Sequence, residues 1–182
     1  MQVLKKLRNI LDSLSDREHY LFAVSDFYSV FPNHSYAALK VVLSRAVKDG
    51  LLMRVCRGIY LNPRVEYPRG LLLYHTAAKL RAGEFNYLSL ETVLSEAGVI
   101  SQIPIAWISL MGSGRSYTVD CSDFGSIEFI HTKKHPNDIA DRLVYDTRCR
   151  LWRAKVGLAL DDMRSTGRSM ELIDWRAADE LV

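Results

Sequence analysis

Residues 35–61, SYAALKVVLSRAVKDGLLMRVCRGIYL, combine the pattern of an amphipathic helix with that of a β-hairpin. Ser35 is suited to cap the N-terminus of a helix that we expect over residues 36–48, and Gly50 is suited to the left-handed residue that ends it. One face of this helix is apolar, because apolar residues recur at helical spacing: Leu39, Val42, Leu43, Ala46 and Val47. The pattern predicts a capped helix of about three to four turns.

Two short apolar segments, 52–55 and 59–61, follow this helix and are predicted to be strands. The sequence CRG joins them, and its Gly58 can take the positive φ that a tight hairpin needs. Arg57 would then lie at the tip of the hairpin, with Arg54 beside it on the first strand.

The residues before this segment predict further elements. An apolar stripe indicates a helix over residues 3–13, and the aromatic run over residues 20–24 is typical of a strand. Ser25 is suited to cap a brief helix with Asp26 in its first turn, and Pro32 stops that helix. A first helix, a short helix, a tight turn, a longer helix and a hairpin follow one another in the order of a winged helix-turn-helix domain.

Such a domain suits DNA, because a capped helix can enter a major groove about 12 Å wide with its first turns facing the base edges. The arginine-bearing hairpin would reach phosphate or the minor groove. The side chains predicted to contact DNA are Asn33, His34, Ser35, Tyr36, Lys40 and Ser44 at the helix, and Arg54 and Arg57 at the hairpin. In the alternative, structural interpretation, Tyr36 is a half-buried aromatic, Lys40 is a solvated charge, and the domain contacts only proteins.

Positive charge is concentrated in the first third of the chain. Residues 1–66 contain ten Lys and Arg against six Asp and Glu, whereas residues 67–182 contain 14 basic and 15 acidic side chains. A basic part joined to a nearly neutral part indicates a polyanionic partner for the first part only.

The composition is that of a folded protein rather than a disordered or fibrous one, with 48% hydrophobic and 25% charged residues in 182. No apolar run approaches the roughly 18–20 residues that cross a bilayer, and the first eleven residues have no pattern of a secretory signal. Cys56, Cys121 and Cys149 are few, odd in number and not paired in spacing. We therefore expect no disulfide framework, no membrane partner and a reducing, cytoplasmic location.

Residues 62–68 have two prolines and no periodicity, so they indicate a connector between domains. The predicted domains are a winged helix-turn-helix over residues 1–66 and a mixed α+β domain with a small sheet over residues 67–182. In the second domain we expect Ser89 to cap a helix, and we expect helices over residues 138–145 and 149–163.

No constellation in the second domain points to catalysis, a metal or a cofactor. The sequence GSGR at residues 112–115 lacks the features of a phosphate-binding loop and is predicted to be a hairpin turn. His131 and His135 flank two lysines that would repel a cation, and the adjacent Asp161 and Asp162 would face different directions. We expect none of these groups to form an active site.

A basic face in the second domain has two possible interpretations, as a solvated surface or as a second binding surface. Its cations alternate with carboxylates, which is typical of a solvated helix, but they would also suit a second contact with nucleic acid or protein. The cations are Arg142, Arg148, Arg150, Arg153 and Lys155.

Two segments resemble a known family. Residues 43–60, LSRAVKDGLLMRVCRGIY, resemble the helix-to-wing segment, ending in Arg-Gly-aliphatic-Tyr, of the AbiEi family of antitoxins. Residues 87–100, YLSLETVLSEAGVI, resemble the segment that opens the second domain of that family. The resemblance spans most of the chain in element order, and its clear motif matches cover about residues 35–61 and 87–131.

The resemblance implies a bacterial transcriptional repressor and antitoxin. The winged-helix domain would bind inverted repeats in its own promoter, as a monomer in solution or a dimer on DNA. The second domain would counteract a nucleotidyltransferase toxin without forming a stable complex with it, which defines a type IV system. The positions that match the recognition helix of the family are Ser35, Tyr36, Lys40 and Ser44, and those that match its wing are Arg54 and Arg57.

Two other classes of function compete with this one. The chain could be a protein-interaction module that binds a toxin or another partner directly, with DNA contact secondary. It could also be an enzyme that acts on nucleotides, which ranks last because no acid cluster, nucleophile–base pair or metal-ligand set is present in the sequence.

Overall fold

The computed structural model describes residues 2–14, 16–102 and 105–182. The chain divides into two compact units, Met1–Leu72 and Leu73–Val182, so the predicted connector at residues 62–68 lies inside the first unit. Each unit combines helices with a β-sheet, which confirms the predicted α+β class. Within the described ranges, every helix is too short or too polar to cross a membrane.

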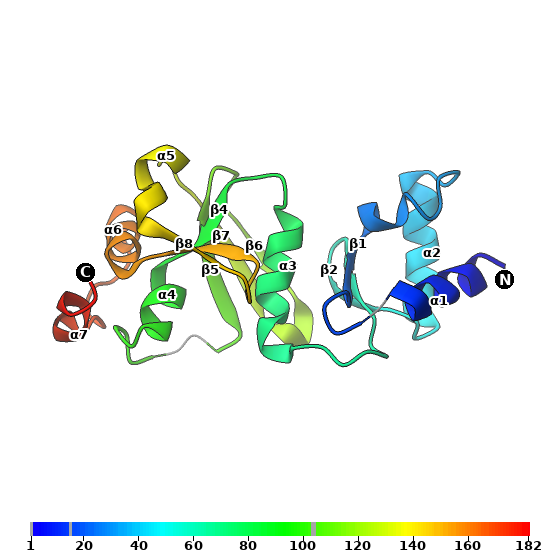
Figure 1. Cartoon of the computed structure of the whole chain (residues 1–182), viewed down its shortest axis with the longest axis horizontal. Coiled ribbons are helices and arrows are strands. Elements are labelled where there is room, and N and C mark those ends of the chain that lie inside the picture. Colours follow the sequence, from blue (N-terminus) through cyan, green and yellow to red (C-terminus); the bar gives the residue numbers. More distant parts are fainter. Residues whose placement is uncertain (1, 15, 103–104) are drawn as a thin grey trace. The chain divides into compact units, whose positions relative to one another are not determined.

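The first unit contains two longer helices and a three-stranded antiparallel sheet in the order β1-β3-β2 (Figure 1). Its elements are α1 (Gln2–Leu14), β1 (Leu21–Ala23), the 3-10 helix η1 (Val24–Phe27), α2 (Tyr36–Lys48), β2 (Met53–Cys56) and β3 (Ile59–Leu61), followed by the 3-10 helix η2 (Arg69–Leu71).

Helix α2 begins and ends as its sequence predicts. The Ser35 hydroxyl accepts a hydrogen bond from the Ala38 N–H at 3.2 Å, which satisfies one of the free donors of the first turn. At the other end Gly50 has a φ of +67°, the left-handed conformation that a glycine adopts without strain. The apolar stripe of α2 packs into the core of the unit, where Leu39, Leu43 and Ala46 are almost fully buried.

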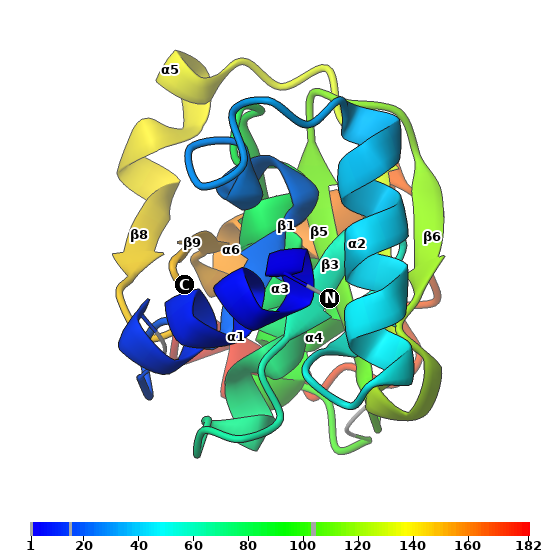
Figure 2. The ribbon, with the colours of Figure 1, turned by 90° about the vertical axis from the view of Figure 1, so that its right-hand side faces the viewer.

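Helix α1 contacts α2 and covers the same core. Figure 2 shows the two helices running crosswise, with the strands behind them. Leu7 and Leu11 of α1 are completely buried and join the cluster of α2. The other buried members of this cluster are Val24, Phe27, Phe31, Val42, Leu51, Leu52 and Tyr60.

The expected capping role of Ser25 is wrong. The residue at the N-cap position of η1 is Ala23, and Ser25 lies inside the helix. The Asp26 carboxylate accepts a hydrogen bond from the Ala23 N–H at 2.8 Å. The Asp26 carboxylate accepts from this donor, and its negative charge is stabilised by the positive end of the helix dipole. A hydroxyl cap is therefore not required.

The second unit is built on a six-stranded mixed sheet in the order β6-β7-β5-β4-β9-β8, larger than the small sheet that the sequence predicts. Strand β5 is parallel to β7, β4 is parallel to β9, and the other neighbours are antiparallel. The strands are β4 (Asn86–Leu88), β5 (Trp107–Gly112), β6 (Tyr117–Asp120), β7 (Ser126–His131), β8 (Leu143–Asp146) and β9 (Leu151–Ala154).

Helices precede, connect and follow the strands of this sheet (Figure 1). They are α3 (Leu72–Leu80), α4 (Leu90–Glu96), the 3-10 helix η3 (Ser122–Phe124), α5 (Pro136–Ile139), the 3-10 helix η4 (Ala140–Arg142), α6 (Val156–Ser165) and α7 (Trp175–Asp179). Helices α4 and α6 pack against each other.

The helices predicted over residues 138–145 and 149–163 are partly wrong. Residues 143–146 and 151–154 instead form the antiparallel pair of β8 and β9, and only residues 156–165 are helical as α6. Tyr145 pairs with Trp152 in this hairpin, with their rings 5.4 Å apart. Aromatic and β-branched residues favour strands when a neighbouring strand is available, and β4 supplies that neighbour.

Adjacent valines of α2 give a matched test of this packing. Val42 is 9% exposed and Val41 is 52% exposed. Replacing either with Ala raises helix propensity equally, so the difference isolates burial. We expect Val42→Ala to lower the unfolding free energy of the first unit by about 2 kcal/mol more than Val41→Ala. Hydrogen exchange of peptides from residues 36–61 along a urea series measures this difference, and equal midpoints would contradict the packing.

Candidate nucleic-acid interface

The exposed side of α2 presents an aligned row of polar side chains. Tyr36, Lys40 and Ser44 are four residues apart, so they lie above one another on one helix face. The Tyr36 ring is half exposed, and the Lys40 ammonium lies 4.7 Å from its centroid in a cation–π contact. This contact holds both side chains at the outer surface of the helix, and Ser44 beyond them is exposed.

The two residues before the cap have different surroundings. Asn33 is exposed, whereas His34 is half-buried with its ring edge against Phe31, 5.3 Å between centroids. The His34 N–H donates to the Phe31 carbonyl at 3.0 Å, which fixes the turn before α2. The His34 Nδ1 atom is buried and has no hydrogen-bond partner among the described residues.

The hairpin of β2 and β3 carries both predicted arginines. Gly58 has a φ of +84° at the turn, and its carbonyl accepts from the Val24 N–H at 3.2 Å. Arg57 is exposed at this turn and forms no hydrogen bond or ion pair with the described residues. Arg54 is also exposed, and its Nε donates to the Cys56 carbonyl at 3.3 Å, which orients the guanidinium along the strand.

Tyr60 links the hairpin to the first turn of α2. Burial raises the pKa of Tyr60, the nearby Arg54 guanidinium lowers it, and the nearby Tyr36 raises it further. Arg54 is the cross-strand partner of Tyr60 in the register of β2 and β3. Tyr60 also belongs to the buried cluster that contains Leu39 and Leu43 of α2, so the hairpin and α2 share one core.

Three further cations were missed from the sequence, two of them near the start of α2 and one, Arg45, in its last turn. Lys5 and Lys6 of α1 line a hollow together with Asn33 and His34, and Arg45 of α2 lines a second hollow with His34. The adjacent lysines on the polar side of an amphipathic helix were a visible signal in the sequence. Their nearness to residues 33 and 34 depends on how α1 packs on α2, which no local pattern specifies.

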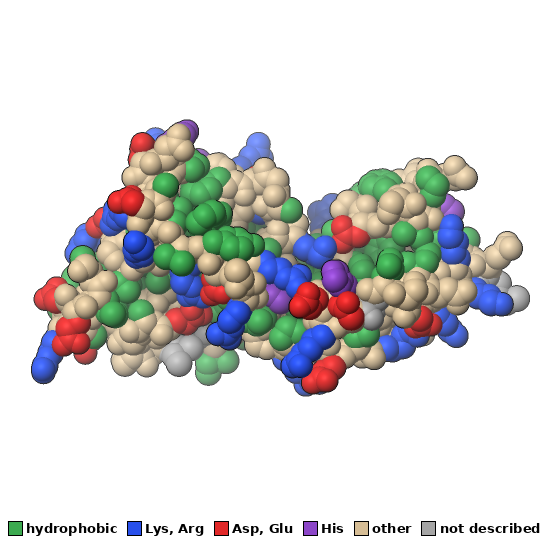
Figure 3. Space-filling model, viewed as in Figure 1, with side chains coloured by type: hydrophobic (Ala, Val, Ile, Leu, Met, Phe, Trp, Pro, Cys, Tyr) green, Lys and Arg blue, Asp and Glu red, His purple; other side chains and the backbone are tan. Residues whose placement is uncertain are grey.

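The basic face of the second unit is largely neutralised by its own carboxylates and carbonyls. Arg142 donates to Asp161 at 2.7 Å, and Lys155 donates to the Asp141 carbonyl at 2.7 Å. Arg153 forms ion pairs with Glu96 and with Asp146. Figure 3 shows cations and carboxylates interspersed over the visible surface of this unit. These pairs favour the solvated-face reading over a second polyanion site.

The two histidines of the second unit have separate structural positions. The His131 Nδ1 atom lies 3.1 Å from the carbonyl oxygens of Ser113 and Gly114, in the turn between β5 and β6. The His135 Nδ1 atom accepts from the Asn137 N–H at 3.4 Å at the start of α5. Across the part of the chain that the structure describes, no three His, Cys, Asp or Glu side chains group as metal ligands.

A buried carboxylate is the main polar feature inside the second unit. Asp162 of α6 is completely buried and accepts from Lys134 and from Ser89, both at 2.6 Å. The Tyr87 hydroxyl donates to it at 3.4 Å, and burial, reinforced by this carboxylate, raises the pKa of Tyr87. Ser89 occupies the N-cap position of α4, but its hydroxyl bonds Asp162 rather than the helix, so the expected cap is wrong.

The backbone at this carboxylate is strained. Leu90, directly after Ser89, has a φ of +57°, a conformation that costs an L-residue about 1–2 kcal/mol. The turn places Ser89 between β4 and α4 with its hydroxyl on Asp162. Each oxygen of Asp162 accepts a hydrogen bond of 2.6 Å, one from Ser89 and one from Lys134. These bonds connect the end of β4 and the segment after β7 to α6. We therefore assign Asp162 a structural role, and we call this set of bonds the lock.

Comparison with known proteins adds no relative. No protein-family model matches this chain, and no curated protein matches it either.

Ser35 offers a test that separates capping from surface contact. Ser35→Ala removes the acceptor for the Ala38 N–H and should lower the unfolding free energy of the first unit by about 1 kcal/mol. Ser35→Asp keeps an acceptor and should leave stability within about 0.5 kcal/mol of the wild type. Hydrogen exchange of α2 in urea measures both, and equal losses in the two variants would contradict the capping role.

The neighbouring Asp161 and Asp162 give a second matched pair. Asp162→Ala leaves Ser89 and Tyr87 buried without their acceptor, so the second unit should lose about 3 kcal/mol. Asp161 is exposed and paired with Arg142 and Arg164, so Asp161→Ala should cost under about 1 kcal/mol. Tryptophan fluorescence in urea reports this unit alone, because every tryptophan of the chain lies in it. A similar effect of both variants would rule out the lock.

Proposed function

We propose that the first unit is a winged helix-turn-helix domain that binds double-stranded DNA and that the chain is a transcriptional repressor. One observation carries this proposal: α2 exposes the row of Tyr36, Lys40 and Ser44, and the hairpin attached to the same core exposes Arg54 and Arg57. The helix row suits base edges in a major groove, and the arginines suit the phosphates beside it.

The repressor would act on its own promoter, through inverted repeats. Two copies on a two-fold symmetric site would each place one α2 in the major groove, whereas the protein can be monomeric in solution. The resemblance to AbiEi antitoxins extends this proposal to a type IV antitoxin whose second unit counteracts a nucleotidyltransferase toxin. The chain would need no catalytic group or cofactor for this function.

A second candidate function is direct binding of a protein partner by the second unit. It is favoured by three large apolar side chains exposed on the hairpin of β8 and β9: Val144, Tyr145 and Trp152. In that case the chain would co-purify stably with its partner, and the affinity for DNA would be weak and indifferent to sequence.

Retardation of the DNA upstream of its own gene in a gel tests the repressor proposal. Arg57→Ala should weaken binding to every duplex and reduce the slope of log affinity against log salt by about 1, because one phosphate contact is lost. Lys40→Met should cost about 1–3 kcal/mol on the preferred duplex and relax the preference. Arg176→Ala, which removes the same charge from the second unit, is the control and should change neither quantity.

Ser35→Asp separates the loss of DNA contact from the loss of stability in this experiment. The variant keeps the helix cap but places a carboxylate among the predicted DNA contacts, so it should fold normally and bind DNA much more weakly. Full retardation by this variant, or no retardation by the wild type at low salt, would contradict the proposed function.

A further inference from the structure

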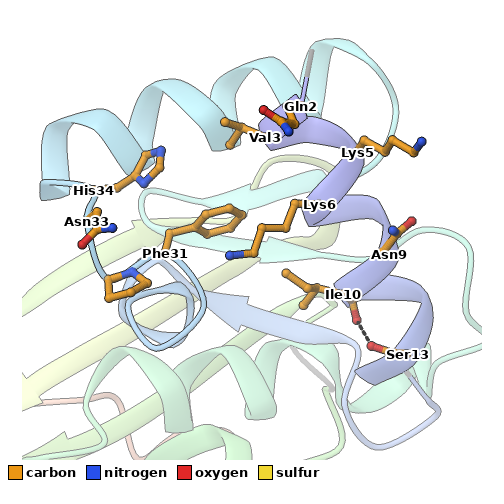
Figure 4. A pocket seen from close by; sticks show the side chains of 11 residues that line it. Gln2, Val3, Lys5, Lys6, Asn9, Ile10, Ser13, Phe31, Asn33 and His34 are labelled. Carbon is orange, nitrogen blue, oxygen red and sulfur yellow. Dashed lines mark hydrogen bonds between the residues drawn. The ribbon is translucent and has the colours of Figure 1, made fainter.

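A hollow of about 620 Å³ lies within the first unit, between α1 and the turn that precedes α2. Figure 4 shows its two walls, with the side chains of α1 on one side and those of residues 31–34 on the other. Its described lining includes Val3, Lys5, Lys6, Ile10, Phe31 and His34. A hollow of this size accommodates a small organic molecule.

The walls combine an apolar interior with cations. Val3, Ile10 and Phe31 offer hydrocarbon and an aromatic face, while Lys5 and Lys6 supply positive charge. None of the described residues that line the hollow is acidic. The chemistry that complements such walls is an anionic group attached to an apolar body.

Lys6 is the cation best placed to hold the anionic group. Its side chain extends from α1 towards Phe31 (Figure 4). The ammonium donates to the Val30 carbonyl at 2.9 Å and lies 5.1 Å from the centroid of the Phe31 ring. A lysine ammonium has three N–H donors, so the Val30 bond leaves two of them for a carboxylate or phosphate.

A second hollow of about 360 Å³ lies between α1 and α2 and has lining residues in common with the first. It shares Val3 and His34 with the first hollow and is lined further along by Val41 and Arg45. Its described lining is again free of acidic residues. His34 lines both hollows, and its Nδ1 atom is buried without a partner among the described residues.

We propose that these hollows bind an organic anion with an apolar body, and that this ligand weakens the binding of DNA. A DNA phosphate would satisfy the lysines but would leave the apolar walls without a partner, which favours a small amphipathic molecule. The regulatory half rests on the proposed function. Asn33 and His34 both line the hollow and belong to the predicted DNA contacts, so ligand and DNA, both anionic, compete for the start of α2. The coupling is reciprocal, because DNA must then weaken the ligand equally.

Phenylbutanoate and the neutral phenylbutanol test the site without DNA. In amide NMR spectra of the full chain, phenylbutanoate should give saturable shifts in α1 and residues 31–45, with phenylbutanol at least about tenfold weaker. Lys6→Met keeps the length of the side chain and should weaken phenylbutanoate about tenfold. Lys5→Met should act in the same direction without touching the bond to Val30. Lys48→Met, an exposed cation of α2 outside both hollows, should bind like the wild type.

Three results would overturn the site: no saturable shifts at millimolar phenylbutanoate, equal binding of the alcohol, or shifts confined to the second unit. The regulatory half is measured by fluorescence anisotropy of labelled upstream DNA, whose apparent Kd should rise at least about threefold at saturating phenylbutanoate. An unchanged Kd with a bound ligand would overturn the regulation and leave the site intact. If the ligand-free wild type did not bind the DNA at all, the proposed function would be overturned, while the NMR titration would still decide the site.

Discussion

The burial of one stripe of α2 determines what the first unit can present to a partner. Leu39, Leu43 and Ala46 have almost no exposure, and with that side of the helix fixed in the core the opposite side must face outward. Tyr36 and Lys40 therefore form a surface pair, four residues apart and in cation–π contact. The helix cannot rotate to hide this row without exposing its apolar stripe, which costs roughly 1.5–3 kcal/mol for each large side chain.

The hairpin depends on the same core. Tyr60 is buried in the cluster that holds α2, and Arg54 is its cross-strand partner. The strand that carries Tyr60, β3, is the central one of the three-stranded sheet, so β1 holds the hairpin along its β3 side. The second unit satisfies its own charges instead, with Asp162 bonded to Lys134 and Ser89. The two units thus differ in how much charge they leave for a partner.

Local patterns were sufficient for α2 and the hairpin of the first unit, although they misplaced the start of the short helix at Ser25. The cap at Ser35, the apolar period of α2 and the glycine at position 58 each act within a few residues, and the structure has these elements at the predicted places. Local patterns failed where the partner is distant in sequence. Residues 143–154 contain enough charge at helical spacing to resemble a helix, but pairing with β4 makes them strands. Ser89 bonds Asp162, 73 residues away, rather than its own helix.

The candidate site shows the same division. The exposed arginines and the row on α2 follow from local sequence, whereas the hollow beside His34 follows from the crossing of α1 and α2 and could not be predicted. An amide NMR titration of the full chain with the duplex upstream of its gene tests whether the first unit binds DNA through α2 and the hairpin. If it does, the shifts are concentrated at residues 33–44 and 54–58, with little change at residues 143–154. Shifts concentrated in the second unit, or none at low salt, would contradict it.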